Sequence, residues 1–430
     1  MTLPATLRAL RYRNFQLFFG GQLISLIGTW MQNVAQAWLV YRLTGSSVML
    51  GLVSFAGQIP VFLISPLGGI VADRFPRQRV VIATQTASML LALTLSALTL
   101  TGAVQKWHIM LLAVGLGVVN AFDIPARQSF FVEMVGREDL INAIALNSSM
   151  FNASRVIGPA VAGILVATIG EGWCFFANGV SYVAVIIGLL CMRLPPYAPV
   201  ARTTSPFADV IEGFRFVIAS RPIHHLMILL GILSLTGMPF AVLMPIFADK
   251  ILHGGARGLG ILMGASGIGA LGGALLLASR ETVHGLGRWV AISAAAFGGT
   301  LVIFALSHSF WPSCALLMPV GFAMMVEMGS SNTLIQTMSP DRLRGRVMSV
   351  YSMMFMGMAP LGAVLSGVSA DRWGASVTVA AGGIVCMSAA AVFGWRLPGL
   401  RAEARRLIAA AQMAGGEPAQ GATGRIAVLK

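Results

Sequence analysis

The sequence predicts an all-α membrane protein whose twelve transmembrane helices form two pseudo-symmetric halves of six. Three observations carry this prediction: the composition, the length of the apolar runs and the placement of the basic residues. Of the 430 residues, 57% are hydrophobic and only 10% are charged, and the mean hydropathy is +0.81. A soluble chain carries about 25% charged residues. Too few charges are therefore present to cover a surface that faces water.

The apolar runs are long enough to cross a bilayer, because a spanning helix needs about 20 predominantly apolar residues. In the first half of the chain we expect spans at 15–40, 48–71, 80–101, 108–129, 143–169 and 173–192. In the second half we expect them at 223–247, 258–279, 289–307, 311–336, 347–369 and 375–395.

The basic residues fall into alternate connections of this layout. With the N-terminus inside, the inside segments carry 23 of the 29 Lys and Arg residues and the outside loops carry 5, while Arg155 lies within a span. An excess of basic residues in the cytoplasmic loops is typical of membrane proteins, so we expect both termini in the cytoplasm. Topology thus explains the net charge of +14, and no nucleic-acid partner is expected.

A Pro-rich polar stretch divides the chain into its two halves. We expect an N-terminal half at 1–193, a cytoplasmic linker at 194–222, a C-terminal half at 223–396 and a cytoplasmic tail at 397–430. The helical spacing from Asp209 to Val217 predicts an amphipathic helix along the membrane surface within the linker. The Gly- and Ala-rich end of the tail predicts disorder.

The two halves repeat each other weakly. Asp123 corresponds to Glu327 at an offset of 204 residues, and Arg74 corresponds to Arg280 at an offset of 206. Near-constant offsets over several spans indicate duplication. In transporters built this way, the substrate path lies near the midplane between the halves.

The turn between the second and third expected spans carries a charged motif. Residues Gly69, Ala72, Asp73, Arg74 and Arg77 match the pattern G-x-L-A-D-R-x-G-R-x-x, with Val71 in place of Leu and Pro76 in place of Gly. This stretch resembles the signature of the major facilitator superfamily. The resemblance implies the major facilitator fold, in which two six-helix halves surround a central path.

The resemblance also implies a gate at the cytoplasmic end. Arg77 would pair with Asp123 and lock that end when the protein opens outward, and Asp73 would face the start of the eleventh span near Arg346, where the helix dipole stabilises a carboxylate. The symmetric candidate pair is Arg280 with Glu327. The expected gate comprises Gly69, Asp73, Arg74, Arg77, Asp123, Arg280 and Glu327. Alternatively, Asp123 or Glu327 carries protons, because carboxylates within membranes serve both roles.

The fifth expected span contains a cation followed by small residues. Gly158, Pro159 and Gly163 follow Arg155 and resemble the G-x-x-x-G-P-x-x-G-G signature of proton-driven exporters, with Ser154 and Ala162 departing from it. The resemblance implies a helix that seals an exporter; ordinary close packing of small residues is the alternative. Arg155 either binds an anionic substrate or partners a carboxylate.

Polar residues form a stripe along the first expected span. Gln22, Ser25, Thr29, Gln32, Asn33 and Gln36 recur at helical spacing on one face. A polar stripe that faced lipid would be costly. We expect the stripe to line the substrate path together with Asn120, and an interhelical hydrogen-bonded seam is the alternative.

Two further segments, 123–128 and 343–349, look like those of the facilitator group that includes enterobactin exporters and related secretion effectors. This resemblance implies a bacterial inner-membrane, drug–proton antiporter type of exporter for a siderophore or drug-like amphiphile. An importer or symporter of a sugar or amino acid is the alternative. We expect a monomer with no cofactor, driven by the proton gradient. The four cysteines lie singly, and neither metal-ligand spacing nor a catalytic cluster is present, so we expect neither a metal site nor an enzyme.

Overall fold

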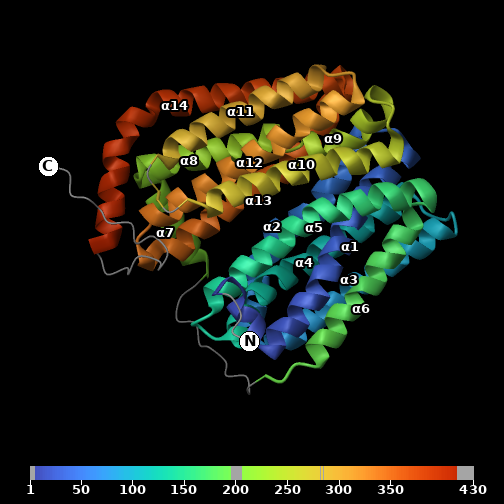
Figure 1. Ribbon diagram of the computed structural model, residues 1–430, viewed down its shortest axis with the longest axis horizontal. Helices are drawn as coiled ribbons and strands as arrows, with labels where there is room; N and C mark the ends of the chain where they lie inside the picture. The colour runs from blue at the N-terminus through green and yellow to red at the C-terminus, as the bar shows by residue number, and fades with distance from the viewer. Residues whose placement is uncertain (1–4, 195–205, 281, 284, 414–430) are drawn as a thin grey trace.

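Long helices build the whole of the described structure. The computed structural model describes residues 5–194, 206–280, 282–283 and 285–413, and no strand occurs among them. After a short 3₁₀-helix, η1 (Ala5–Arg11), the first half contains α1 (Arg13–Thr44), α2 (Ser47–Arg74), α3 (Arg77–Leu100), α4 (Lys106–Val135), α5 (Leu140–Thr168) and α6 (Glu171–Leu190) (Figure 1).

The second half follows a connecting helix, α7 (Pro206–Ala219). It contains α8 (Arg221–Ile232), η2 (Leu233–Gly237), α9 (Phe240–Ile246), η3 (Phe247–Ile251), α10 (Gly255–Ala278), α11 (Leu286–Leu306), α12 (Phe310–Met338), α13 (Asp341–Trp373) and α14 (Ala375–Met413). The segments η2 and η3 are π-helical turns within one long span, next to Pro239 and Pro245. Proline cannot donate the usual helical hydrogen bond, so the ladder shifts register there.

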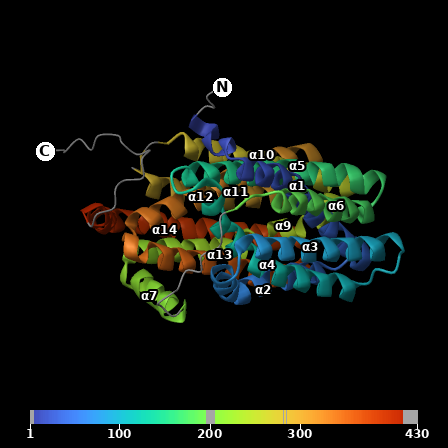
Figure 2. The same cartoon turned by 90° about the horizontal axis from the view of Figure 1, so that it is seen from below.

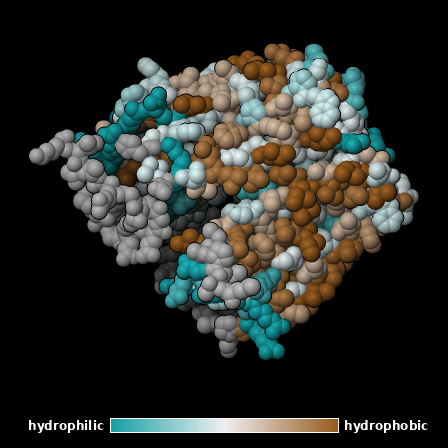
Figure 3. All heavy atoms as spheres, viewed as in Figure 1, coloured by the Kyte–Doolittle hydropathy of each residue, from teal (hydrophilic) through white to brown (hydrophobic). Residues whose placement is uncertain are grey.

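Among the described residues, eleven helices are long and apolar enough to cross a membrane. The remaining long helix is α1, whose polar stripe lowers its hydropathy. It packs against α5 and α6 as a full member of the first half. The predicted fold class is therefore confirmed, and the chain is a multi-pass membrane protein. Figure 3 shows hydrophobic residues along the sides of the helices and hydrophilic ones toward the ends.

The two halves are built alike. In the first half α2 packs on α4 and α3 on α6, and in the second half α10 packs on α12 and α11 on α14. Between the halves, the extensive contacts are those of α2 with α13 and of α5 with α10. This pairing follows the internal repeat, because α10 and α13 are the counterparts of α2 and α5.

Each end of the bundle has its own set of connections. The end that carries η1, α7 and the turns from α2 to α3, α4 to α5 and α12 to α13 is called the basic end here. The other end, with the turns from α1 to α2, α5 to α6 and α13 to α14, is called the far end. In Figure 1 the ribbons of the two halves meet toward the far end and separate toward the basic end.

The linker and the tail both contain helix. The helix α7 lies where the amphipathic linker helix is predicted, and it packs against α13 and α8 at the edge of the bundle (Figure 2). The last span and the helical start of the tail form a single helix, α14, which continues through Pro398 to Met413. The predicted disorder at the chain's end lies outside the described residues.

Candidate functional site: a path closed at the far end

Backbone contacts between small residues join the halves at the far end. A Cβ atom added to Gly260 of α10 would lie 2.6 Å from the carbonyl oxygen of Pro159 on α5. On the other helix pair, a Cβ added to Gly367 of α13 would lie 2.6 Å from the carbonyl oxygen of Ser47 on α2. Carbon atoms normally pack about 3.5–4.0 Å apart. The halves therefore touch as closely as glycine permits.

The predicted packing signature of α5 lies within this contact. Gly163 faces α10, since an added Cβ would lie 2.9 Å from Cα of Gly260. Gly158 faces α1, where an added Cβ would lie 2.5 Å from Cβ of Trp30 and 2.9 Å from the carbonyl oxygen of Ile27. Thus α5 is wedged between α1 of its own half and α10 of the other, with Pro159 buried between them.

One hydrogen bond reinforces the closure of the far end. The hydroxyl of Tyr41, near the end of α1, donates to Oδ2 of Asp249 in η3 at 2.9 Å. These residues belong to different halves, and Tyr41 is only 6% exposed. This bond must break if the far end opens.

Two glycines near the basic ends of α2 and α13 are not in close contact. A Cβ added to Gly69 of α2 or to Gly345 of α13 would meet nothing within 4 Å. Both glycines lie near the basic end of their helices, whereas the close contacts of the same helices involve Ser47 and Gly367 at the far end. The gate residue Gly69 is therefore not packed in this conformation.

The predicted pair of Arg77 with Asp123 is corrected by the structure. Nη1 of Arg77 lies 2.6 Å from Oε1 of Glu133, the carboxylate nearer the basic end of α4. Asp123 lies ten residues earlier, which is about 15 Å deeper along the helix. Because Arg77 starts α3 at the basic end, Glu133 is within its reach.

Asp123 instead belongs to a buried network inside the first half. Its Oδ1 accepts hydrogen bonds from Thr84 at 2.8 Å and Gln85 at 2.9 Å, both on α3. Its Oδ2 lies 3.3 Å from Nε of Arg127, one turn along α4. With a cation and two donors, this 3%-exposed carboxylate is well satisfied.

Glu327 has a different environment at the repeat-related position. Oε1 of Glu327 accepts a hydrogen bond from Ser331 at 2.9 Å, and the residue is 1% exposed. The predicted partner, Arg280, lies at the end of α10 with its guanidinium 4.7 Å from the centre of the Trp289 ring. The Arg280–Glu327 pair is thus also corrected, because the tryptophan of α11 holds the arginine beside the end of its own helix.

The remaining gate residues lie at the end of α2. Arg74 is exposed and Asp73 is half-buried. Arg346, near which Asp73 is expected, forms an ion pair with Glu212 of α7, and Arg342 lies 3.7 Å from the same carboxylate. The expected approach of Asp73 to the start of α13 remains a prediction.

The polar stripe of α1 divides between two environments. Gln22, Ser25 and Gln32 are buried, and Oε1 of Gln32 accepts a hydrogen bond from Asn178 of α6 at 2.7 Å. Thr29 donates to the carbonyl oxygen of Ser25 on its own helix. For Gln32 the geometry is that of the interhelical seam. Asn33 is exposed, and Gln36 and Asn120 are half-buried, so these three remain candidates for the path.

Arg155 lies on α5 at the level of the contact with α10. Its guanidinium carbon is 5.8 Å from the centre of the Trp30 ring on α1, within the range of a cation–π contact. Its own carbonyl oxygen would lie 2.9 Å from a Cβ added to Gly267 of α10. The cation is thus held where α1, α5 and α10 meet.

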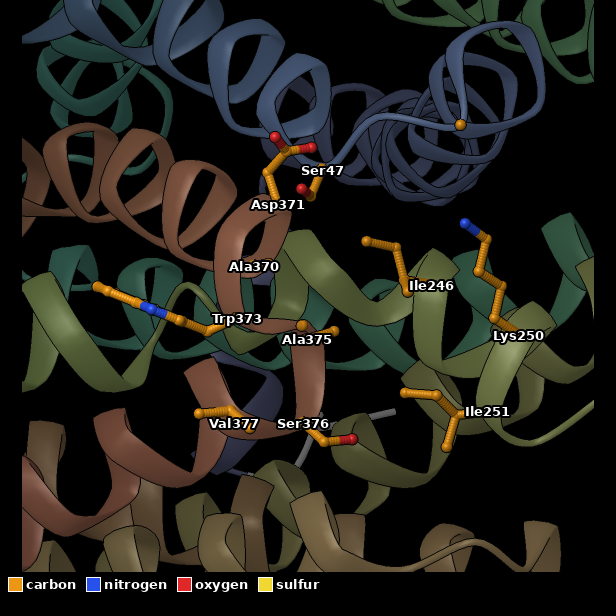
Figure 4. Close-up of a pocket in the computed structure, with 12 residues that line it drawn as sticks. Ser47, Ile246, Lys250, Ile251, Ala370, Asp371, Trp373, Ala375, Ser376 and Val377 are labelled. Atoms are coloured by element: carbon orange, nitrogen blue, oxygen red, sulfur yellow. The ribbon is translucent and has the colours of Figure 1, made fainter.

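A pocket of about 410 Å³ opens at the far end, next to the contact of α2 with α13. Figure 4 shows Ser47 and Asp371 on one side of it and Lys250 on the other, with Ile246 between them. The pocket lies beside the close contact between α2 and α13.

The sequence analysis missed four residues that the geometry makes important: Glu133, Arg127, Asn178 and Glu212. Glu133 carried a usable signal, because it is the carboxylate nearest the basic end of α4. For Asn178 and Glu212 no such signal exists, since their partners come from distant helices. Among the described residues, no group of three His, Cys, Asp or Glu side chains is arranged to hold a metal ion.

The family model and the relatives that match this chain are described as membrane secretion or transport proteins. The family model described as "Transmembrane secretion effector" matches residues 4–423. The Staphyloferrin A transporter of Staphylococcus aureus is 26% identical over 381 residues, covering 87% of this chain and 94% of the relative. The multidrug efflux pump Tap of Mycolicibacterium fortuitum is 28% identical over 365 residues, covering 82% and 88%.

The enterobactin exporter EntS of Escherichia coli O1:K1 is 26% identical over 356 residues, covering 82% of this chain and 84% of the relative. Among solved structures, the nucleoside transporter NupG aligns with a TM-score of 0.68 at 13% identity, covering 90% of this chain and 98% of that one. A likeness at this identity concerns the fold alone.

Proposed function

The chain belongs to the transmembrane secretion effector family of membrane transporters, and on this premise we propose that it exports a small amphiphilic molecule by alternating access, driven by proton entry. Relatives named for siderophores and for multidrug efflux support a siderophore or drug-like cargo. The chain is a transporter rather than an enzyme.

The basic end is the cytoplasmic one in this proposal. It carries most of the arginines, as cytoplasmic loops do, and this places the protein in a bacterial inner membrane with both termini inside. The conformation described here is then open to the cytoplasm and closed to the outside. Its far-end contacts, Tyr41–Asp249 and Gly163–Gly260, form the outer gate.

The inner gate lies at the basic ends of α2 and α13 in this proposal. For the cytoplasmic end to close, α13 must approach α2. Gly69 leaves room for that approach, because a Cβ added to it would meet nothing within 4 Å. Asp73, at the end of α2, and the start of α13 belong to this gate in our proposal. Arg77 acts with Glu133 in this account, holding α3 against α4 at the same end.

Glu327 is the observation that carries the proton-coupling part of the proposal. It is buried in α12, and its recorded contact is a single hydroxyl of its own helix. Asp123 is occupied by Arg127, Thr84 and Gln85. Ionisable residues within membrane helices either pair with one another or mark proton and substrate paths, and Asp123 is the paired carboxylate of the two. We therefore assign proton transfer to Glu327.

Arg155 is the proposed contact for an anionic group of the cargo. Its recorded neighbour is an aromatic ring, which leaves the hydrogen-bond donors of the guanidinium for a carboxylate or a similar group. Asn33, Gln36 and Asn120 would line the path beside it.

Transport in inside-out vesicles tests this function. With the proton gradient acid inside, vesicles that contain the wild-type protein should accumulate a siderophore or a lipophilic dye. Glu327→Gln should remove accumulation but keep counterflow of the same compound, because exchange needs no net proton movement. Glu138→Gln, the same change at an exposed residue between α4 and α5, is the matched control and should keep accumulation. Undiminished accumulation by Glu327→Gln would end its role as carrier. Counterflow of a sugar or amino acid instead would favour the importer.

A further inference from the structure

An apolar groove runs between α8 and α14 on the outside of the second half. It encloses about 280 Å³ and is lined by α8 from His225 to Ile232 and by α14 from Val385 to Phe393. Its floor is buried, with Leu229 at 2% and Phe393 at 4% exposure, and its rims are exposed, with Ile228 at 46% and Val392 at 52%. The groove therefore faces the surroundings of the helix bundle, which for a membrane protein are lipid.

Small side chains create the groove. Ser388 and Ala389 of α14 stand in the lining where larger residues would fill the space between the helices. The Ser388 hydroxyl donates to the carbonyl oxygen of Ile384 at 2.9 Å, so it is satisfied within its own helix and offers an apolar face. The eight residues of α8 from His225 to Ile232 give the groove a length of about 10 Å, which suits part of an extended acyl chain.

Cationic side chains lie at the basic end of the groove. Arg396 follows the lining residues by one turn, and its Nη1 lies 2.9 Å from Nε2 of His225. His225 lies within hydrogen-bonding distance of the carbonyl oxygen of Arg221 through Nδ1, at 2.8 Å. The imidazole therefore donates through Nδ1 and accepts from the arginine through Nε2. This contact fixes Arg396 over the mouth of the groove.

The helix that continues past the groove adds further positive charge. Arg401, Arg405 and Arg406 are exposed on the C-terminal part of α14, while Leu400 on the opposite face is buried. Glu403 lies near the backbone N–H of Arg221 at 3.3 Å, so that carboxylate faces the start of α8. Trp395 is 80% exposed beside Arg396, and exposed tryptophans are typical of the membrane–water boundary.

We propose that the α8–α14 groove binds an acyl chain of an anionic phospholipid, whose headgroup is held by Arg396. A lipid without net charge would use the groove but would not neutralise Arg396 and the arginines beyond it. A transmembrane helix of another protein would not match an arginine cluster at the headgroup level. Basic pockets between helices at the cytoplasmic side are known as sites for anionic headgroups. Because the contact joins α8 to α14, the lipid would brace the second half without touching the substrate path.

Native mass spectrometry of the full chain in detergent tests the proposal. Dioleoyl phosphatidylglycerol should bind as one retained copy, and dioleoyl phosphatidylcholine should bind more weakly. Arg396→Gln should weaken phosphatidylglycerol binding about five-fold, the effect of one arginine near a headgroup. Ala389→Leu should abolish the retained copy by filling the groove. Inorganic phosphate should not displace the lipid, since the acyl chain supplies much of the binding.

Two matched variants separate the site from general charge and bulk. Arg193→Gln removes an exposed arginine of the first half, and Ala391→Leu adds the same bulk to an exposed position on another face of α14. Both should bind phosphatidylglycerol as the wild type does. Size-exclusion profiles without lipid check that each variant folds, and Ser388→Leu replaces Ala389→Leu if that variant aggregates. Equal binding of the two lipids, undiminished binding by either groove variant, or equal losses in the controls would overturn the proposal.

Discussion

The contact of α5 with α10 should set which end of the transporter is open. Gly260→Ala adds one Cβ atom, which would lie 2.6 Å from Cα of Gly163 and 2.6 Å from the carbonyl oxygen of Pro159. Both obstructing atoms belong to the backbone and cannot rotate away. Since carbon atoms pack about 3.5–4.0 Å apart, the two helices must separate by about 1 Å at this level.

The cost of this overlap acts on one conformation alone. Overpacking a close contact costs about 1–3 kcal/mol, and the far-end-closed state bears it, because separation of the halves relieves the overlap. A difference of that size shifts a two-state equilibrium about five- to 150-fold. Gly260→Ala should therefore raise the population that is open at the far end by at least about five-fold.

A cysteine at Ser47 reports this opening. Ser47 is 5% exposed within the contact of α2 with α13, so Ser47→Cys should react slowly with a membrane-impermeant maleimide once the native cysteines are replaced. Gly260→Ala should speed its labelling at least about five-fold. Gly264→Ala is the control on the same helix, because its Cβ would meet only the Val156 carbonyl oxygen, at 3.9 Å. Unchanged labelling in Gly260→Ala, or an equal rise in the control, would refute the reasoning.

Two further predictions concern single polar contacts. Tyr41→Phe removes the bond to Asp249 across the halves, and a hydrogen bond to a charged group contributes about 1.5–3 kcal/mol. Tyr41→Phe should therefore speed labelling of the Ser47→Cys reporter about ten-fold or more. Tyr12→Phe loses a hydrogen bond within the first half and should not change the labelling rate. Equal effects of the two variants would contradict the assignment of an outer gate. Glu133→Gln should lower the free energy of unfolding in detergent by about 1 kcal/mol, since its ion pair is partly exposed. Asp123→Asn should cost more, about 3 kcal/mol, because it breaks an ion pair whose carboxylate is buried, and the reverse order would contradict the described burial.

The sequence was sufficient for the architecture because span length and charge asymmetry are properties of single helices. Each apolar run had to become a helix, since lipid cannot satisfy an open backbone. The polar stripe of α1 illustrates the limit. Its spacing predicts one face, but the seam with Asn178 depends on how α1 packs against α6, which no local pattern records.

The partner predicted for Arg77 was wrong for a related reason. The sequence predicted that Arg77 pairs with Asp123, the deeper carboxylate of α4. In the structure Arg77 pairs with Glu133, at the basic end of that helix. A difference of ten residues turns the position by about 80° around the helix, short of three full turns, and moves it by about 15 Å along the axis. Faces can be read from periodicity, whereas depth requires the exact start of each helix, which sequence patterns place only to within a few residues.

The two buried carboxylates related by the internal repeat have different surroundings, and the residue at one neighbouring position explains the difference. Asp123 and Glu327 are equivalent by duplication, and each is contacted by the residue four places further along its helix. In α4 that residue is Arg127, a cation 3.3 Å from Asp123. In α12 it is Ser331, a hydroxyl that donates to Glu327 at 2.9 Å. Glu327 thus has a neutral neighbour at the position where Asp123 has a cation. The two halves thus share one fold while their repeat-related carboxylates differ in surroundings, and this difference is why we propose the proton-transfer role for Glu327 and not for Asp123.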